Sequence, residues 1–465
     1  MSRTIPNLEF DCYRILVFRR AGIDILLLSD GCTFSLPEVA VPRWQRIAPH
    51  LAIAVREKFD LDIVCLDFHQ MAQSDEDAQS RRYALAEIVE EPLGQASLCW
   101  VPWTRVERQS LRDQSDLEAL HASLAVIQAQ PDQPFGTFGW LSRIREWVNS
   151  VIAPHGLRLS GRFEQLNAGP RTSLLRFETD ASALWFKAVA ESQKTEFRIS
   201  QELARIFPKF VPEILGINED WNAWLMKEFA GVHPDVRSDL AVWKGVTTAL
   251  AELQIASLGQ TLHLIDAGCR DMRTSALCAA MDPFVRVSGQ LMRRQTSTAV
   301  PALSREELAA LRHQLAVLLR RLEDLEIPNT LGHLDFNPGN ILVSPSHCHF
   351  LDWAEAAVGN PFLTFEYLLA YLRRVSRDAA ATESELRDAY AASWKEFLSP
   401  RVIREAFALA RVLAVYAVVI RLLTEPPSPE SHAFVRSLIR RMKREIELFV
   451  CGGSGILQDL SEGRP

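Results

Sequence analysis

The stretch Leu331–Pro361, LGHLDFNPGNILVSPSHCHFLDWAEAAVGNP, constrains the fold more than any other part of the chain. Two short apolar runs, Ile341–Val343 and His349–Leu351, flank a serine-containing turn, a pattern typical of a β-hairpin. Asn340 directly precedes this hairpin and Asp352 directly follows it, so pairing of the strands should bring the two side chains close together. Two oxygen ligands at one point suit Mg²⁺, which also takes phosphate oxygens and waters. The hairpin therefore predicts a magnesium site.

Asp335 lies five residues before Asn340, where its carboxylate can accept a proton from a hydroxyl group. Phosphoryl transfer needs such a set, because its transition state is loose and catalysis rests on positioning and charge neutralisation. The protein-kinase signature H-R-D-L-x-x-x-N spaces its Asp and Asn in the same way, and a metal-binding Asp follows. The spacing therefore predicts Asp335 as the catalytic base.

The segment His333–Asn340 closely resembles the H-G-D-L-H-P-G-N loop of the aminoglycoside phosphotransferase and choline kinase family. Asp352–Trp353 resembles the I-D-W metal motif of that family, and Gly359–Pro361 resembles its G-D-P sequel. The resemblance implies a protein-kinase-like fold, in which His333 orders the loop, and transfer of phosphate from ATP or GTP to a small-molecule hydroxyl. Three departures leave the predicted base and metal ligands in place: Leu334 for Gly, Asn337 for His and Asn360 for Asp.

A weaker resemblance to the same family extends upstream, over about residues 162–231. Lys187, in the predicted strand LWFKAV, matches the lysine that contacts the nucleotide phosphates. Glu196 matches the helix glutamate that positions this lysine, and Glu202 is the competing acid on the same predicted helix. A single lysine on a strand is usually a solvated edge residue, but its order before Glu196 and the catalytic loop favours the functional interpretation.

Two further segments match nucleotide-binding parts of the family. The loop Asn167–Ser173, NAGPRTS, resembles the shorter phosphate loop, in which backbone N–H groups and a hydroxyl approach the phosphates. Ser173 is the candidate for that hydroxyl. The segment Met226–Phe229, with Met226 and Glu228, is the candidate inter-lobe hinge that pairs with the base; the alternative is an ordinary strand end.

The order of predicted elements, strands first and helices afterwards, is that of a two-lobe kinase. We predict an α+β protein-kinase-like fold, with a small antiparallel-sheet lobe and a helical lobe, preceded by a separate α/β domain. The predicted division is as follows: 1–129, accessory domain; 130–160, linker and connecting helix; 161–230, nucleotide-binding lobe; 231–465, helical lobe with the catalytic loop. Because Ala129–Gly139 is rich in Gln, Pro and Gly, we expect a chain starting near Pro134 to fold and keep kinase activity.

The accessory region Arg14–Ile63 faintly resembles a degenerate Nudix domain. Its Arg56–Glu57 pair is followed by Lys58, Phe59, Asp60 and Leu61, so the glutamates that bind Mg²⁺ in active Nudix motifs are absent. A non-catalytic binding or dimerisation domain is favoured over a hydrolase, and a plain α/β domain unrelated to Nudix remains a competing interpretation.

Composition limits the partners and the compartment. The 465 residues are 48% hydrophobic and 23% charged with a net charge of -7, which argues against nucleic-acid binding. Eight scattered cysteines predict reduced thiols in a cytoplasmic protein. No signal peptide is recognisable in Met1–Asp11, and the apolar run Val412–Ile420 is far shorter than the roughly 20 residues of a membrane span, so no membrane partner is expected.

Other functions remain open. A eukaryotic-type protein kinase is disfavoured because Asp352 is followed by Trp353–Ala354, not Phe-Gly, and no A-P-E sequence follows. The main alternative is a catalytically inactive nucleotide-binding scaffold. The acceptor is undetermined: aminoglycosides, amino alcohols, sugars and homoserine-like compounds all fit. Asp266, Asp271 and Glu355 could meet a cationic acceptor, but for each of them the interpretation as a surface charge is favoured.

Overall fold

The computed structural model describes residues 9–19, 23–29, 31–71, 81–90, 98–106, 111–129, 135–169, 171–235, 238–375, 379–424 and 429–451. Contacts divide the chain into two compact units. Unit 1 comprises Met1–Phe197 and Glu213–Glu228, and unit 2 comprises Arg198–Pro212 and Phe229–Pro465. The predicted accessory domain and the predicted nucleotide-binding sheet thus fall in one unit. The predicted linker lies partly outside the described residues, as do the hairpin turn Ala21–Gly22 and the site Pro134.

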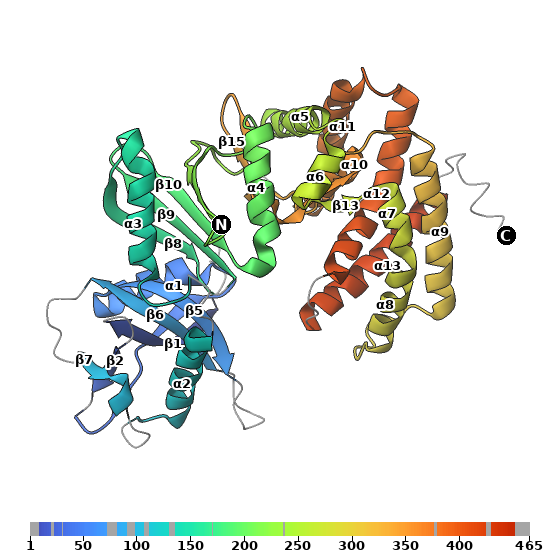
Figure 1. Cartoon of the computed structure of the whole chain (residues 1–465). Coiled ribbons are helices and arrows are strands. Elements are labelled where there is room, and N and C mark those ends of the chain that lie inside the picture. Colours follow the sequence, from blue (N-terminus) through green and yellow to red (C-terminus); the bar gives the residue numbers. More distant parts are fainter. Residues whose placement is uncertain are drawn as a thin grey trace, which may run out of the picture. The chain divides into compact units, whose positions relative to one another are not determined.

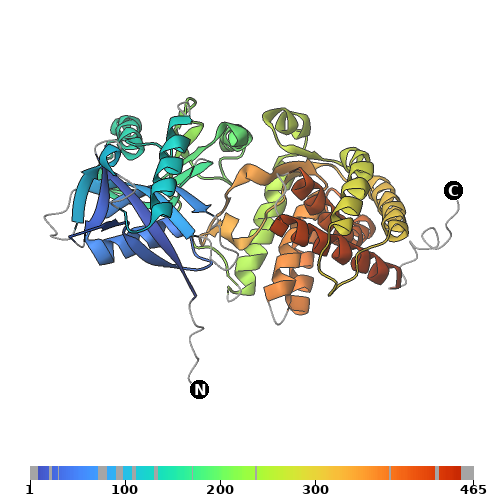
Figure 2. The same ribbon diagram turned by 90° about the horizontal axis from the view of Figure 1, so that it is seen from below.

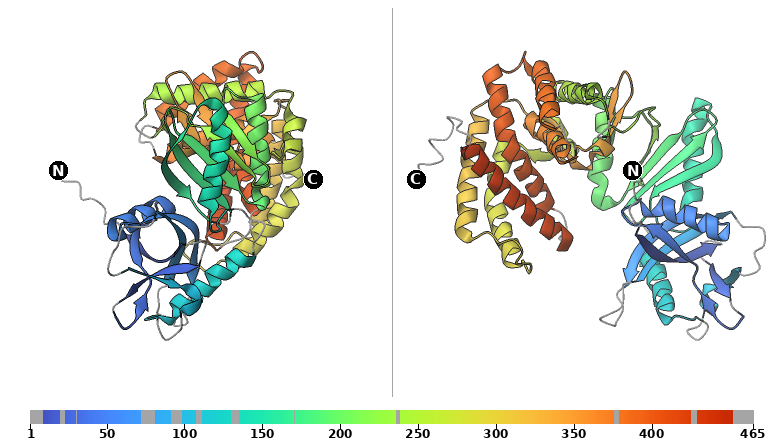
Figure 3. Two further views of the ribbon diagram at one scale, coloured as in Figure 1. Left: turned by 60° about the vertical axis from the view of Figure 1, so that its left-hand side comes forward. Right: turned by 180° about the vertical axis from the view of Figure 1, so that it is seen from behind.

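The first part of unit 1 is a curved, seven-stranded mixed sheet with the path β3-β2-β1-β6-β5, in which β4 pairs with β1 and β7 with β2 (Figure 3). β1 and β2 pair in antiparallel fashion, whereas β1 and β6 are parallel. The bounds are β1 Phe10–Arg19, β2 Asp24–Ser29, β3 Phe34–Ser35, β4 Glu38–Pro42, α1 Ile47–Phe59, β5 Asp62–Met71, β6 Arg81–Glu90, β7 Leu98–Pro102, η1 Trp103–Arg105 and α2 Gln114–Ala129.

Alternation along β1 sends side chains to two different cores. Ile15 and Val17 pack with α1 on one face of the sheet, while Leu16 and Phe18 belong to a second cluster with residues of α2. This is the period-2 pattern of a strand buried on both faces. The sheet is therefore covered by helices on both sides.

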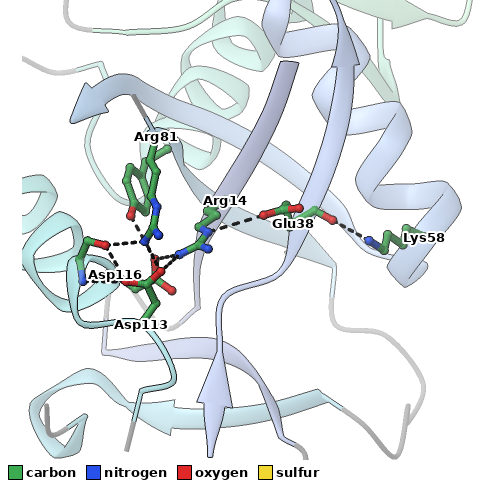
Figure 4. A network of polar contacts seen from close by, with 8 residues as sticks. Arg14, Glu38, Lys58, Arg81, Asp113 and Asp116 are labelled. Atoms are coloured by element: carbon green, nitrogen blue, oxygen red, sulfur yellow. Dashed lines mark hydrogen bonds and ion pairs between the residues drawn. The ribbon is translucent and has the colours of Figure 1, made fainter. Parts of the chain in front are cut away.

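A polar network fastens the start of α2 to the sheet (Figure 4). Arg14 of β1 donates to Asp113 at 2.9 Å and to Asp116 at 2.6 Å, and Arg81 of β6 also pairs with Asp113. The hydroxyl of the buried Tyr83 donates to Asp116 at 3.0 Å. Because Asp116 is itself buried, these donors offset the cost of removing its charge from water.

The second part of unit 1 is a five-stranded antiparallel sheet with the order β11-β12-β10-β9-β8, the small lobe that the sequence predicted. Helix α3 lies along one face of it (Figure 1). The bounds are α3 Trp140–Ile152, η2 Ala153–His155, β8 Leu159–Asn167, β9 Thr172–Thr179, β10 Leu184–Val189, η3 Glu191–Gln193, α4 Lys194–Ile206, β11 Ile214–Asn218 and β12 Ala223–Lys227. The division between the units falls within α4, after Phe197.

The two sheets of unit 1 share one hydrophobic core. The cluster that holds Leu16 and Phe18 continues through Trp140 of α3 to Phe186 and Leu225 of the five-stranded sheet. Trp140 packs against Phe186 with ring centroids 5.8 Å apart. The accessory region is therefore built into the same core as the small lobe.

Unit 2 is mainly helical, as predicted. Its helices surround a three-stranded sheet of order β13-β17-β14 and the hairpin β15–β16. Helices α8 and α9 pack beside α12 and α13 (Figure 2). The bounds are α5 Leu240–Ala256, α6 Thr261–Ala267, β13 Arg270–Met272, α7 Thr274–Ala279, α8 Met281–Arg293, α9 Arg305–Glu323, β14 Thr330–His333, η4 Pro338–Asn340, β15 Ile341–Val343, β16 Cys348–Phe350, η5 Trp353–Glu355, β17 Ala356–Gly359, α10 Pro361–Val375, α11 Ala379–Trp394, α12 Pro400–Leu423 and α13 Pro429–Cys451.

Helix α12 is, among the described residues, the one helix long and apolar enough to cross a membrane by length and composition. Most of its apolar stretch is buried inside unit 2, including Leu409, Leu413 and Tyr416. The apolar run Val412–Ile420 therefore lies in a core helix of unit 2.

Candidate active site

The predicted hairpin forms and aligns the two predicted metal ligands. In the register of β15 and β16, Ile341 lies opposite Phe350, and the pairing continues outward where Leu351 N–H donates to the Asn340 carbonyl at 2.8 Å. Asp352 is the next residue along the chain. Asp352 is exposed and has φ 60° and ψ 64°, a left-handed conformation that Asp tolerates better than most residues.

Asp335 lies beside this pair and its carboxylate is held at both oxygens. The hydroxyl of Tyr367 donates to Oδ1 at 3.0 Å, and the Asn340 side-chain amide donates to Oδ2 at 3.3 Å. The same amide nitrogen donates to the Asp335 carbonyl at 2.9 Å. Because both contacts use the nitrogen of Asn340, its amide oxygen is directed elsewhere and can serve as a ligand.

His333 joins the catalytic loop to the strand that leads to Asp352. Its Nε2–H donates to the Leu351 carbonyl at 3.1 Å, and its Nδ1 accepts from the Asp335 N–H at 3.1 Å. Complete burial lowers the pKa of His333, which favours the neutral ring that these two bonds require. The contacts are those of a loop-ordering residue, as the resemblance implied.

The three departures from the family pattern have local roles. Leu334 is buried and its N–H donates to the Glu355 carbonyl. The Asn337 side chain accepts from Gly339 N–H at 2.9 Å, which caps the short turn η4. Asn360 accepts from Phe362 N–H at 3.0 Å at the start of α10. The Asn337 and Asn360 side chains therefore stabilise η4 and the start of α10, and the Leu334 side chain belongs to the core of unit 2.

In unit 1, Lys187 of β10 forms an ion pair with Glu196 in the first turn of α4. The side chains are 13% and 5% exposed, so the pair is largely removed from water. The competing Glu202 lies in unit 2 and pairs with Arg205, whose Nε is 3.1 Å from Glu202 Oε1 and whose Nη2 makes a closer contact. This ion pair lowers the pKa of Glu202 to about 2. The geometry therefore selects Glu196 as the partner of Lys187.

Ser173, the predicted hydroxyl of the phosphate loop, lies inside the core of unit 1. It is 3% exposed, and its hydroxyl accepts from Trp140 Nε1 at 3.2 Å. The Ser173 hydroxyl is therefore engaged inside the core of unit 1, and its predicted contact with a phosphate stays a prediction. The neighbouring Arg171, which is exposed, and Thr172, which is half-buried, are more accessible parts of the loop.

The predicted hinge residues are partly engaged within unit 1. Met226 lies opposite Trp185, and its sulfur accepts from Trp224 Nε1 at 3.2 Å. Glu228 accepts from Arg176 at 2.6 and 3.1 Å, which lowers the pKa of Glu228, and its N–H donates to the Ala183 carbonyl. A base contact by Glu228 would therefore have to use its carbonyl oxygen, not its carboxylate.

Comparison with known proteins places the catalytic segment in a family. Residues 185–405 match the model of the phosphotransferase enzyme family, and this range contains Lys187, Asp335 and Asp352. This segment is similar to that family, and the predicted resemblance to a phosphotransferase family is confirmed over it. The prediction of an α+β protein-kinase-like fold, with an antiparallel-sheet lobe and a helical lobe, is confirmed.

Similar folds occur among solved structures of phosphotransferases and kinases. The chain is similar to macrolide 2'-phosphotransferase MphH from Brachybacterium faecium, with 17% identity, covering 63% of this chain and 97% of that one, at TM-score 0.42. It is similar to a choline/ethanolamine kinase family protein from Mesorhizobium loti, with 15% identity, covering 66% of this chain and 95% of that one, at TM-score 0.46. An ethanolamine kinase from Plasmodium vivax is also similar, with 12% identity, covering 64% of this chain and 86% of that one, at TM-score 0.46. No curated protein sequence matched, and the Nudix resemblance received no support.

Tyr367 is a residue of the candidate site that the sequence did not reveal. It lies on α10, where aromatic and aliphatic residues predominate. Nothing in that local pattern distinguishes a packing tyrosine from one that reaches Asp335. The only available signal was that α10 follows directly after the metal motif.

Two of the acids considered for a cationic acceptor are already paired. Asp271 lies 2.7 Å from Arg273, which lowers its pKa. Glu355 pairs with Arg270 at 3.2 Å and with Arg421 at 3.1 Å. Their charges are therefore balanced within unit 2, and neither favours a cationic acceptor.

Proposed function

We propose that this phosphotransferase moves the γ-phosphate of ATP or GTP to a hydroxyl group of a small molecule. The observation that carries the proposal is the arrangement of Asp335, with Tyr367 on one carboxylate oxygen and Asn340 on the other. Such a carboxylate is oriented to accept the proton of an alcohol. The acceptor oxygen then bonds to the γ-phosphorus, the bond from phosphorus to the β-phosphate oxygen breaks, and the nucleoside diphosphate leaves.

The donors beside Asp335 fit a Mg²⁺ ion bound together with the nucleotide. Asn340 and Asp352 offer one amide oxygen and one carboxylate, a donor set that suits Mg²⁺ completed by phosphate oxygens and waters. In the described part of the chain, no group of three or more His, Cys, Asp or Glu side chains could hold a metal ion. When bound, the ion would neutralise charge on the phosphates.

Lys187 is the proposed contact with the nucleotide phosphates in unit 1. Glu196 fixes its ammonium group, because a partly buried ion pair restricts the long lysine side chain. Met226 and the backbone around Glu228 are the proposed contacts with the base. We leave Ser173 out of the proposed site.

A screen for ATP and GTP consumption by the purified protein against a library of hydroxyl-bearing metabolites tests the proposal. Consumption that depends on an acceptor and on Mg²⁺, and that Asp335→Ala abolishes while nucleotide binding persists, is the expected result. The matched control is Asp324→Ala, at the C-terminal end of α9. Turnover of an identified acceptor that is unchanged in Asp335→Ala would refute the role of the base.

A further inference from the structure

The loop Asn167–Ser173 between β8 and β9 is held by residues from the first 129 positions of the chain. We propose that this N-terminal region positions the loop for nucleotide binding, with Arg46 as a positioning residue that acts through Asn167. The inference rests on the proposed function, because it takes the loop to be the phosphate loop. It gives the N-terminal region a defined task in the same reaction.

The first contact is made at the start of the loop. Arg46 directly precedes α1, and its Nη1 donates to Asn167 Oδ1 at 3.0 Å. Arg46 is exposed, so its removal should leave the core of unit 1 intact. The contact therefore joins residues 121 positions apart without being needed for folding.

The second contact is buried and lies two residues earlier. The Gln165 side chain accepts from Cys65 N–H at 2.8 Å and donates to the Cys65 carbonyl at 2.8 Å. The strand pairing is irregular at both ends of this contact, between Gln165 and Asn167 in β8 and between Cys65 and Asp67 in β5. One side-chain amide thus satisfies both backbone groups of Cys65, which would otherwise be buried without partners.

The third contact covers the middle of the loop. Ala168 packs against the core cluster formed by β1 and α1. Gly169 is buried with φ +124°, and a Cβ atom there would lie 3.7 Å from Asp67 Oδ1. Gly136 also lies close to the Gly169 backbone, because a Cβ atom added at Gly136 would lie 3.9 Å from the Gly169 carbonyl group. The first half of the loop is therefore enclosed by unit 1, while Arg171 in the second half is exposed.

These contacts fix the described first part of the loop, residues 167–169, before a nucleotide arrives. A loop that is already ordered loses less conformational entropy when it binds, so the same contacts give higher affinity. Loosening the Arg46 contact should therefore weaken nucleotide binding without changing the chemical step, since Arg46 acts on the loop and not on the reacting atoms.

The test combines loop mobility with nucleotide affinity in the full-length chain. Hydrogen–deuterium exchange of peptides covering residues 163–177 should be faster in Arg46→Ala than in wild type, in the absence of nucleotide. Calorimetric titration with Mg-ATP should show an affinity about fivefold weaker, the effect of one lost hydrogen bond, with kcat unchanged. The matched control is Arg56→Ala, on the exposed face of α1, whose partner is Asp62 at 2.7 Å.

A double-mutant cycle with Asn167→Ala separates positioning from direct contact. If Arg46 acts through Asn167, Arg46→Ala should have no further effect in the Asn167→Ala background. An equal effect in both backgrounds, or unchanged exchange and affinity in Arg46→Ala, would overturn the inference. If wild type binds neither ATP nor GTP, the proposed function fails instead; the exchange measurement alone then decides whether Arg46 anchors the loop.

Discussion

The hydroxyl of Tyr367 donates a hydrogen bond to Oδ1 of Asp335 at 3.0 Å, joining helix α10 to the catalytic loop. Burial, and then the negative charge of Asp335, raise the pKa of Tyr367 to about 12. The tyrosine therefore remains a protonated donor at neutral pH. Its bond fixes the orientation of the carboxylate, so Tyr367 is expected to position the base.

Tyr367→Phe should lower kcat about 10- to 100-fold, the effect of a lost hydrogen bond to a charged group, with little change in nucleotide KM. The ring still fills its place on α10, so the melting temperature should change little. Tyr371→Phe is the control. Tyr371 lies one turn further along α10, and the Cζ atom of Arg374 is 6.0 Å from the centre of its ring. Equal kinetics in the two variants would return Tyr367 to a packing role.

Asp352→Asn should remove the Mg²⁺ dependence of nucleotide binding and lower kcat/KM by about 100-fold, since a metal-bound transition state loses several kcal/mol of stabilisation. Asn tolerates the left-handed backbone of Asp352 nearly as well as Asp, so the fold should persist. Calorimetric titration of ATP with and without Mg²⁺ measures the effect. A Mg²⁺ dependence like that of wild type would contradict the metal role.

Lys187→Met should raise the nucleotide KM and also destabilise the protein. Glu196 is 4% exposed, and breaking a buried ion pair on one side costs about 3–5 kcal/mol. Lys187→Met/Glu196→Leu should restore the melting temperature but not the kinetics. Lys194→Met, on an exposed pair with Glu191, is the control. If the double variant regained wild-type KM, the lysine would have a structural role alone.

The sequence predicted the elements whose pattern is local. The hairpin before Asp352 needed only two apolar runs and a turn, and its two strands pair as expected. The burial of Ser173 was not predicted, because it depends on Trp140, a contact 33 residues away. The parallel pairing of β1 with β6 also joins distant segments, and local patterns do not encode such partners.

Stability should fall as the pH falls below about 6.5, the ordinary pKa of histidine. Burial lowers the pKa of His333 and lowers that of His349 to about 4. Between these values the unfolded chain binds protons that the folded chain does not, so the free energy of unfolding decreases with decreasing pH. Urea unfolding of His349→Leu should show a smaller decrease between pH 7 and pH 5, and the exposed His313→Gln should behave as wild type.

Removing residues 1–134 should destabilise unit 1, contrary to the expectation from the apparent linker. Phe135 and Trp140 share a core with Leu16 and Phe18, and truncation would expose that surface to water. Each large apolar side chain left exposed costs about 1.5–3 kcal/mol, so several together are comparable to the roughly 5–15 kcal/mol stability of a typical protein. Truncation would also remove Cys65, so the buried side-chain amide of Gln165 would lose both of its hydrogen bonds to the Cys65 backbone.

Soluble yield, melting temperature and ATP affinity of the chain 135–465 measure this effect. We expect an insoluble product that co-expression of residues 1–134 partly rescues, since the separate chains can rebuild the shared core. A soluble chain 135–465 with wild-type melting temperature and ATP affinity would show that the N-terminal region is dispensable. A third outcome is a soluble chain that binds ATP more weakly and has faster hydrogen exchange at residues 163–177. This result would show that the N-terminal region anchors the loop at Asn167 but is not needed for folding.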